Sequence, residues 1–372
     1  MPIYMDVHIV PGVKARGVAE AHHKDLMHQD EFACKCMTYW IDEERENVFC
    51  LIEAPSKEAV EELHGKAHGL IPNRIIEVSP DVVSSFLGRI YDPSEAETTD
   101  DGLKVFADPS FRTLVVIRTA DPVLLQNKLG TERSYELLNR QNDTIRRNLL
   151  RHGGREVEHS GTGFILSFTS ASKAVSCALA IKQEMQEYND GASAVQVAIN
   201  AGEPVEKSNH LFGDTLQLAG YMCAIAGNMQ IVVASAVKEL VAKDHFQIKG
   251  GGLLALSPQD EALLGFLFGN LEKNWQDAEF DIEDYCRAMA MSKSQLYRKT
   301  IQLTGLSPNI LLKEFRLAKA KDLMRKNPYS ISQITFESGF SSPSYFTKCF
   351  KKKYGLLPMA YLELLHQAIH FR

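Results

Sequence analysis

The spacing of apolar residues divides the chain into stretches of different character. Over the first ninety residues, alternation of apolar and polar positions predicts strands, and apolar residues at helical spacing predict two helices between them. The strands are expected at 2–10, 37–42, 48–53 and 75–78, and the helices at 18–30 and 57–69. A strand–helix–strand–strand–helix–strand (βαββαβ) order is the ferredoxin-like arrangement, which we expect over residues 1–90.

A second sheet-containing stretch follows an acidic linker. Residues 91–110 contain two prolines and little periodicity, as linkers do. A strand at 113–117, a long amphipathic helix ending near 149 and a hairpin at 155–168 then predict another α+β domain, over residues 111–248. The KGGG run at 249–252 marks a further break, and residues 249–272 are expected to be a linker with a connecting helix.

The last hundred residues, 273–372, contain one helical pattern twice. In 330–358, an apolar stripe precedes Gly339, and a second helix begins at Pro343 with small polar and basic residues on its remaining faces. Residues 280–305 repeat this arrangement, and a continuous helix joins the copies. Such a helix, held by another across a tight turn, suits the major groove of DNA. The alternative is a basic amphipathic helix on any protein surface, which the second copy disfavours.

The motifs of this stretch resemble those of the AraC/XylS family of transcription factors. The resemblance rests on Gly339–Phe340, Tyr345–Phe346, Phe350–Lys351–Lys352, Gly355 and Pro358. It implies an all-α double helix-turn-helix domain with two recognition helices in successive major grooves. Leu362 departs from the family, which usually has Arg there. The residues implied to contact DNA are Ser294, Gln295, Tyr297, Arg298, Lys299, Ser344, Tyr345, Lys348, Lys351 and Lys352.

The distribution of charge supports a DNA partner for the C-terminal stretch. The whole chain of 372 residues has a net charge of −6, yet residues 273–372 hold 16 Lys and Arg against 9 Asp and Glu. A basic module on an acidic remainder fits a DNA reader with a regulatory part. The sequence shows neither a signal peptide nor an apolar run of about 20 residues, and its seven cysteines are scattered. We therefore expect a cytoplasmic protein with no membrane partner.

Histidines are concentrated in the first domain. His8 lies on the first predicted strand and His22 on the first helix, while His64 and His68 stand four residues apart on the second helix. This spacing points both imidazoles in one direction, which suits a transition metal. The alternative is a set of ordinary surface histidines, because such pairs also occur by chance.

The same domain resembles a family of small ferredoxin-like proteins, some of them nickel-binding. The matching motifs include Tyr4-Met-Asp-Val-His8, Asp25-Leu26, Tyr39-Trp40, Phe49-Cys50-Leu51 and His64 with His68-Gly69. The resemblance implies a metal site for nickel or zinc. Its implied ligands are His8, His22, Cys50, His64 and His68.

The middle domain resembles the catalytic domain of class III nucleotide cyclases. The motifs are Gly153-Gly154-Arg155-Glu156-Val157, Gly161-Thr162-Gly163-Phe164, Ala201-Gly202-Glu203-Pro204-Val205 and Phe212-Gly213-Asp214. The family needs two aspartates to hold two metal ions, a lysine that reads the base, and an Asn and an Arg for the transition state. These positions hold Arg118 or Thr119, Thr162, Glu158, Gln217 and Tyr221. The resemblance therefore implies a cyclase-like fold without cyclase activity, kept for dimerisation or ligand binding.

Two functions follow from these parts. The first is a multidomain α+β transcription regulator that senses a metal or ligand, forms a homodimer and reads double-stranded DNA, with RNA polymerase as a further candidate partner. The second is an enzyme, a residual nucleotide cyclase with a DNA-binding tail. The missing catalytic residues favour the regulator.

Overall fold

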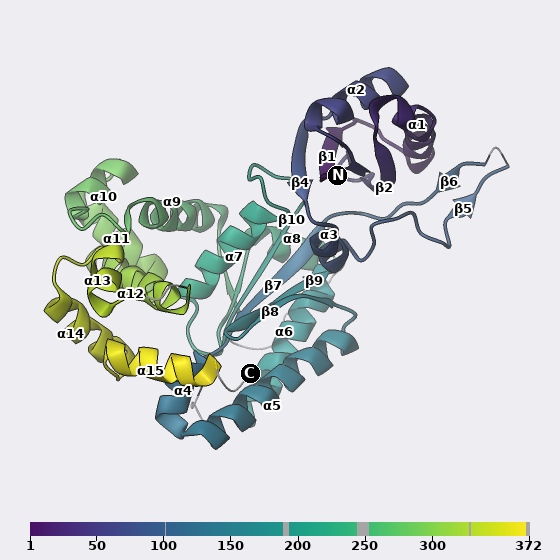
Figure 1. Ribbon diagram of the computed structural model, residues 1–372. Helices are drawn as coiled ribbons and strands as arrows, with labels where there is room; N and C mark the ends of the chain where they lie inside the picture. The colour runs from purple at the N-terminus through teal and green to yellow at the C-terminus, as the bar shows by residue number, and fades with distance from the viewer. Residues whose placement is uncertain (101, 189–192, 244–252, 327–328, 370–372) are drawn as a thin grey trace.

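The computed structural model describes residues 1–100, 102–188, 193–243, 253–326 and 329–369 (Figure 1). The expected multidomain α+β class is confirmed: a four-stranded sheet with helices, a six-stranded sheet with helices and an all-helical region follow one another. The expected glycine break at 249–252 lies outside the described residues. No helix within the described ranges combines the length and apolar character that crossing a bilayer requires.

The first domain has the expected βαββαβ order. Its antiparallel sheet has the strand order β2-β3-β1-β4. Its elements are β1 (Ile3–Ile9), α1 (Ala15–His28), η1 (Gln29–Phe32), β2 (Lys35–Asp42), β3 (Asn47–Glu53), α2 (Lys57–Ala67) and β4 (Arg74–Val78). An additional helix, α3 (Pro80–Leu87), follows β4 and ends at Gly88 with a positive φ of 89°. Sequence periodicity did not predict this helix, because its eight residues are too few for a clear pattern.

The segment expected as a linker packs against the first domain. It forms a small hairpin of β5 (Glu97–Thr98) and β6 (Lys104–Val105). Beyond the hairpin, the ring of Phe106 stacks on that of Tyr39 with centroids 4.1 Å apart, and the Ile41 amide donates to the Asp108 carbonyl at 3.1 Å. The segment therefore lies along β2 as a strap.

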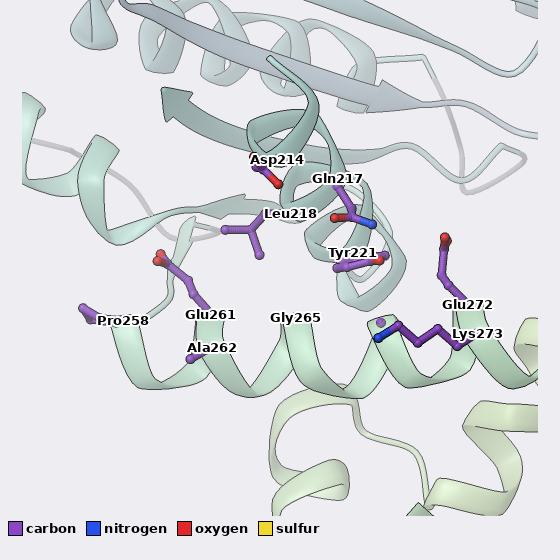
Figure 2. A pocket seen from close by; sticks show the side chains of 11 residues that line it. Asp214, Gln217, Leu218, Tyr221, Pro258, Glu261, Ala262, Gly265, Glu272 and Lys273 are labelled. Atoms are coloured by element: carbon purple, nitrogen blue, oxygen red, sulfur yellow. The ribbon is translucent and has the colours of Figure 1, made fainter. Parts of the chain in front are cut away.

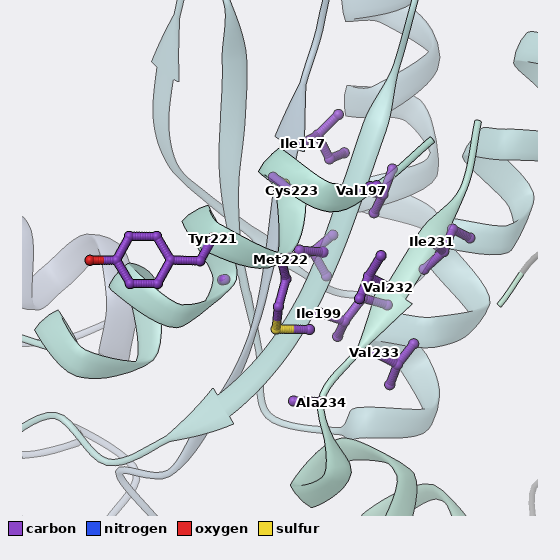
Figure 3. Packing of buried hydrophobic residues seen from close by; sticks show 14 of the residues in the cluster. Ile117, Val197, Ile199, Tyr221, Met222, Cys223, Ile231, Val232, Val233 and Ala234 are labelled. Carbon is purple, nitrogen blue, oxygen red and sulfur yellow. The ribbon is translucent and has the colours of Figure 1, made fainter. Parts of the chain in front are cut away.

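The middle domain is built on a sheet of order β12-β11-β10-β7-β9-β8. Its elements are β7 (Arg112–Arg118), α4 (Pro122–Leu129), α5 (Thr131–Arg151), β8 (Arg155–Ser160), β9 (Gly163–Phe168), α6 (Ala171–Gln186), β10 (Gln196–Gly202), α7 (Gly213–Ile225), β11 (Ile231–Val233), α8 (Ser235–Lys243) and β12 (Leu253–Ala255). The helical stretch after β7 is two helices, because Gly130 adopts a φ of 81° between them. Figure 3 shows Met222 and Cys223 of α7 packed with Val197 and Ile199 of β10, while the Tyr221 ring points away from them.

One apolar cluster joins the first two domains. Alternate residues of β1 and β3, such as Val7 and Phe49, face away from α1 and α2. They pack with Phe86 of α3 and with Phe212, which directly precedes α7 of the middle domain. The rings of Phe86 and Phe212 have centroids 4.9 Å apart. The sheet of the first domain thus contacts the middle domain through its second face.

The C-terminal region begins with a connecting helix, α9, and then contains one helical unit twice. The first unit is built on the helix pair α10 and α11, and the second unit on the pair α13 and α14. The helices are α9 (Pro258–Asn274), α10 (Ile282–Met289), α11 (Lys293–Thr304), α12 (Pro308–Lys326), α13 (Ile331–Glu337), α14 (Pro343–Tyr354) and α15 (Pro358–Ile369). The helices α11 and α14 correspond at an offset of 50 residues: each begins after a capping serine, Ser292 or Ser342, and each ends at a glycine with positive φ, Gly305 or Gly355.

The two units contact the middle domain differently. The first unit shares a continuous apolar core with α9, α7 and the middle sheet, through Leu264, Phe268 and Tyr285. The second unit has its own core, which includes Val123 of α4. Beside Val123, the carboxylate of Asp121 accepts hydrogen bonds from a group of three side chains of the C-terminal region. These are Lys321 at 2.9 Å, Arg325 at 2.6 Å and the Tyr361 hydroxyl at 3.0 Å.

Candidate metal centre and nucleic-acid interface

Strand alternation places two polar side chains of β1 beneath the helices. Asp6 and His8 face α1 and α2, whereas their neighbours Met5 and Val7 face the middle domain. The register of the β1–β3 pair sets Asp6 opposite Cys50. All three polar residues are buried, and Asp6 has no exposed surface.

The helix α2 completes the cluster with His64. One ligand atom from each of Asp6, His8, Cys50 and His64 lies within 4.8 Å of the others. A second such group shares His64 and adds Asp25 of α1 and His68. The i, i+4 spacing of His64 and His68 does point both rings in one direction, and His68 Nε2 lies 3.0 Å from His64 Nδ1.

His64 lies between two carboxylates. Its Nε2 is 3.1 Å from Asp6 Oδ2, and its Nδ1 is 3.1 Å from Asp25 Oδ1. Burial alone would lower the pKa of this imidazole, but the charges and hydrogen bonds of Asp6 and Asp25 raise the pKa of His64 to about 10. Burial likewise opposes ionisation of Asp6, yet His64 and His8 hold the pKa of that carboxyl well below its ordinary value.

Three atoms of the cluster lack the hydrogen bonds that buried polar atoms normally make. These are Asp6 Oδ1 and both ring nitrogens of His8. His8 Nε2 lies 3.2 Å from Asp6 Oδ1 without hydrogen-bond geometry. A cation bound between this carboxylate and this imidazole would coordinate these atoms and so replace the missing hydrogen bonds.

The chemistry of the donor set fits nickel or zinc. Imidazole nitrogen and thiolate sulfur are ligands that these metals prefer, and Mg²⁺ or Ca²⁺ would demand oxygen atoms. Burial raises the pKa of the Cys50 thiol well above its usual value, and the charge of Asp6 adds to this effect. Metal binding at this site would therefore displace protons from both Cys50 and His64.

His22 lies outside both groups of close ligand atoms. Its Nε2 is 3.9 Å from Asp92 Oδ2, and its ring lies 5.2 Å from that of Tyr39. His22 does line a cavity of about 250 Å³ that opens onto the cluster. The cavity lining also includes His8, Asp25, Cys50 and His68.

Sequence reasoning omitted two acidic residues of the centre, Asp6 and Asp25. Both stand within the motifs that carry the resemblance, beside His8 and after His22. Their burial is the informative property, because an unpaired carboxylate is rarely fully buried. Only the fold reveals that burial.

The recognition helix of the first unit exposes most of the residues expected to contact DNA. Ser294, Arg298 and Lys299 are exposed on α11. Gln295 is also exposed, but its side-chain oxygen accepts the Ser292 amide at 3.0 Å in a capping box. Tyr297 is half-buried, and its hydroxyl accepts a hydrogen bond from Asn309 at 2.8 Å. Arg298 is thus exposed on α11, as are Ser294 and Lys299.

The second recognition helix, α14, presents the corresponding surface. Its Ser344, Tyr345 and Lys348 are exposed, and so are Lys351 and Lys352 in its last turn. Phe346 and Phe350 on the opposite face are fully buried. Lys348 occupies the position that Arg298 has in α11, at the offset of 50 residues.

The cyclase resemblance assigned its two metal-binding positions to Arg118 or Thr119 and to Thr162. Thr119 follows β7, and its amide donates to the Thr162 carbonyl at 2.9 Å, so the two positions are neighbours. Gln217 and Tyr221 lie on α7, facing the connecting helix α9 (Figure 2). The rings of Tyr221 and Phe268 stack with centroids 5.0 Å apart.

Two segments of the chain match family models. Residues 285–363 match the model described as a helix-turn-helix domain. This segment is a helix-turn-helix domain. Residues 4–78 match the model described as nickel responsive protein SCO4226-like. The resemblances expected for the two ends of the chain are thereby confirmed.

Curated relatives match only part of the chain. Histidine kinase P4 of Formosa agariphila is 36% identical over 108 residues, which are 29% of this chain and 8% of the kinase. The HTH-type transcriptional regulator MtrA of Neisseria gonorrhoeae is 35% identical over 83 residues, 22% of this chain and 28% of MtrA. The chain thus spans less than a third of either relative.

Solved structures are similar to single domains. The crystal structure of SCO4226 from Streptomyces coelicolor is 32% identical and covers 20% of this chain and 94% of its own, with a TM-score of 0.20. The adenylate/guanylate cyclase/hydrolase from Silicibacter pomeroyi is 23% identical and covers 36% of this chain and 81% of its own, with a TM-score of 0.32.

Proposed function

We propose that this chain is a cytoplasmic transcription regulator that reads double-stranded DNA and responds to a transition metal. The observation that carries the proposal is the pair of exposed recognition helices within a helix-turn-helix domain. The similar MtrA bears the name of a transcriptional regulator. We divide the chain into a metal-binding domain (1–90), a strap (91–110), a cyclase-like domain (111–248), a connecting segment (249–272) and a DNA-binding domain (273–372). The strand β12 of the connecting segment adds to the sheet of the cyclase-like domain.

The metal would be held by Asp6, His8, Cys50 and His64, with Asp25 and His68 behind them. A nickel or zinc ion at this centre would supply a positive charge that draws the ligands together. The orphaned atoms of Asp6 and His8 support this assignment. Asp25 orients His64 through Nδ1, as outer carboxylates orient metal-bound imidazoles.

Contacts between the first two domains provide a route by which metal could affect DNA reading. The Asn47 side chain at the start of β3 donates to Glu203 at 2.5 Å, and Arg74 donates to Asn209 at 2.9 Å. Both acceptors lie in the segment that leads into α7, which packs on α9. Metal regulates DNA affinity only if it binds two arrangements of these domains with different affinity.

Calorimetric titration of Ni²⁺ and Zn²⁺ into the full chain tests the metal centre. His8→Ala and His64→Ala should each weaken binding at least about tenfold, the loss typical when a ligand or its support is removed. His23→Ala is the matched control, because His23 is exposed on the same domain outside both ligand groups. Equal binding by all four proteins would contradict the site.

DNA reading is tested by selecting binding sites from a random DNA pool with the full chain. The affinity for the selected site is then measured with and without saturating Ni²⁺ or Zn²⁺. We expect metal to change that affinity by about 5-fold or more, the lower end of ordinary allosteric coupling. Failure to select any sequence would contradict the regulator, whereas an unchanged affinity would contradict only the metal response.

We also propose that the middle domain has no cyclase activity. Threonine hydroxyls at positions 119 and 162 cannot replace carboxylates that gather divalent ions. Incubation with ATP or GTP and Mn²⁺ should give no cyclic nucleotide. Detection of cyclic product above that of a heat-inactivated sample would restore the alternative function, a residual cyclase.

The proposal includes a homodimer and, where the output is activation, contact with RNA polymerase. The face of α7 that carries Gln217 and Tyr221 is covered by α9 of the same chain. The helix α5 offers another surface, because Tyr135 and Leu150 on it are 68% and 77% exposed. Sedimentation of the full chain at tens of micromolar should show a dimer, and Leu150→Asp should weaken it.

A further inference from the structure

A large cavity lies beside the contact between α7 of the middle domain and the connecting helix α9. It has a volume of about 740 Å³ and lies between α7 and α9 (Figure 2). Gln217, Leu218 and Tyr221 line it from α7, while Gly265 and Gly269 line it from α9. This volume is within the range of pockets that hold drug-sized molecules, about 300–1,000 Å³.

The two glycines keep the cavity open. They stand four residues apart on one face of α9, where glycine is less favourable than alanine by about 1 kcal/mol each. Close helix packing would explain them, but a Cβ built on Gly265 or Gly269 would meet no atom within 4 Å. The missing side chains therefore leave space rather than permit contact.

A buried hydroxyl lies at the wall of this space. Tyr221 is only 7% exposed, and among the described residues the one polar side chain that affects its hydroxyl through a hydrogen bond is that of Gln217, whose contact falls outside normal hydrogen-bond geometry. Burial and the charge of Glu272 raise the pKa of Tyr221 to about 12, although Gln217 opposes the shift, so the hydroxyl keeps its proton. Because the Gln217 contact is poorly aligned, a ligand in the cavity could supply this hydroxyl with a better polar partner.

The charges around the cavity are mainly negative. Asp214, Glu261 and Glu272 line it together with Lys273, and Glu272 also lies 3.5 Å from the ammonium group of Lys319. Asp214 accepts two backbone amides and Glu261 accepts from Ser235, so both carboxylates are fixed in position. The side chain of Leu218 and the ring of Tyr221 provide the apolar part of the lining.

We propose that this cavity binds a small organic cation with an aromatic or apolar body. The cationic group lies among the carboxylates, the body packs on Leu218 and the Tyr221 ring, and the Tyr221 hydroxyl donates to a polar atom of the ligand. This site lies outside the metal centre and the DNA-binding surface, and it depends on neither.

Fluorescence anisotropy of two dyes with the full chain tests the site. Rhodamine 6G is a cation, and fluorescein carries the same ring system with negative charge. Rhodamine 6G should bind at least about tenfold more tightly, which corresponds to about 1.4 kcal/mol. Equal binding of the two dyes would overturn the proposal.

Three variants locate the binding site. Gly269→Leu fills the cavity without lowering helix propensity and should abolish binding of rhodamine 6G while the melting temperature holds or rises. Tyr221→Phe removes only the hydroxyl and should weaken binding about 3- to 10-fold. Glu272→Gln should also weaken binding, whereas Glu279→Gln, outside the cavity, should not. Unchanged binding by Gly269→Leu would overturn the proposal even if the dyes differ.

Discussion

The two helix-turn-helix units are similar in themselves and differ in how the rest of the protein holds them. The first is continuous with the middle domain through one apolar core, which contains Phe268, Tyr285 and Leu296. The second has a separate core and reaches the middle domain at α4, where Asp121 gathers Lys321, Arg325 and Tyr361.

The two attachments differ in the kind of interaction: the first is apolar burial, and the second includes a buried ionic contact. Apolar burial is non-directional and depends little on pH or salt, so the first unit has a permanent attachment. A buried carboxylate that binds two cations depends on a single group and fails when that group is lost or neutralised. The second unit is therefore the one whose docking can be broken without unfolding its neighbour.

The largest effect is expected where the apolar attachment is cut. Phe268→Ala should lower the free energy of unfolding by about 3–5 kcal/mol, because Phe268 is 3% exposed and its ring stacks on that of Tyr221. Chemical denaturation measures this loss. Phe266→Ala is the control: Phe266 lies on the same helix but is 66% exposed, and should change stability by less than about 0.5 kcal/mol. Similar losses in both variants would contradict the continuous core.

The next effect concerns the ionic attachment. Asp121→Ala leaves Lys321 and Arg325 without their buried partner and should cost about 3 kcal/mol. Hydrogen exchange should become faster in the second half of α12 and in α13–α15, and stay unchanged in α10 and α11. Asp322→Ala provides the control, since Asp322 also contacts Arg325 but is 53% exposed. Equal acceleration in both units would mean that they are docked together.

Acid should release the second unit from the middle domain before it releases the first. The loss of stability should be no larger than that caused by Asp121→Ala. Burial alone would raise the pKa of Asp121, but Lys321 and Arg325 hold it below the ordinary value of 3.8. A depressed pKa means that the contact contributes fully above that ordinary value and is lost as pH falls through the folded-state value. The protection factors of α14 and α15, which divide out the intrinsic pH dependence of amide exchange, should therefore stay constant from pH 7 to pH 5 and fall only in stronger acid. A fall already near neutral pH would contradict this assignment.

The smallest effects concern base reading. Arg298→Ala should weaken binding to the selected DNA site by about 1–3 kcal/mol, because Arg can contact guanine with two hydrogen bonds. It should also relax the sequence preference in the half of the DNA site that α11 contacts. Lys348→Ala, at the corresponding position of α14, should cost less, since an ammonium group lacks this paired geometry. Selection experiments with both variants measure the difference. Unchanged sequence preference in Arg298→Ala would show that α11 does not read bases.

Much of the fold was predictable because its signals are local. The serine caps of α11 and α14, their terminal glycines and the repeated apolar stripes act within a few residues, so they define the helices in sequence. The spacing of His64 and His68 likewise predicted that these two imidazoles point in one direction. The same local signals could not show that residues 97–105 form a hairpin of two-residue strands.

Tertiary structure decided which side chains meet and which surfaces are covered. Asp6, Cys50 and His64 converge because β1 pairs with β3 and α2 crosses that sheet, and His22 falls outside because its helix turns it toward the strap. The contact of Asp121 with Arg325 joins groups 204 residues apart. Contacts of this kind depend on how whole elements pack, since burial and the pairing of charges arise only when distant segments exclude water together.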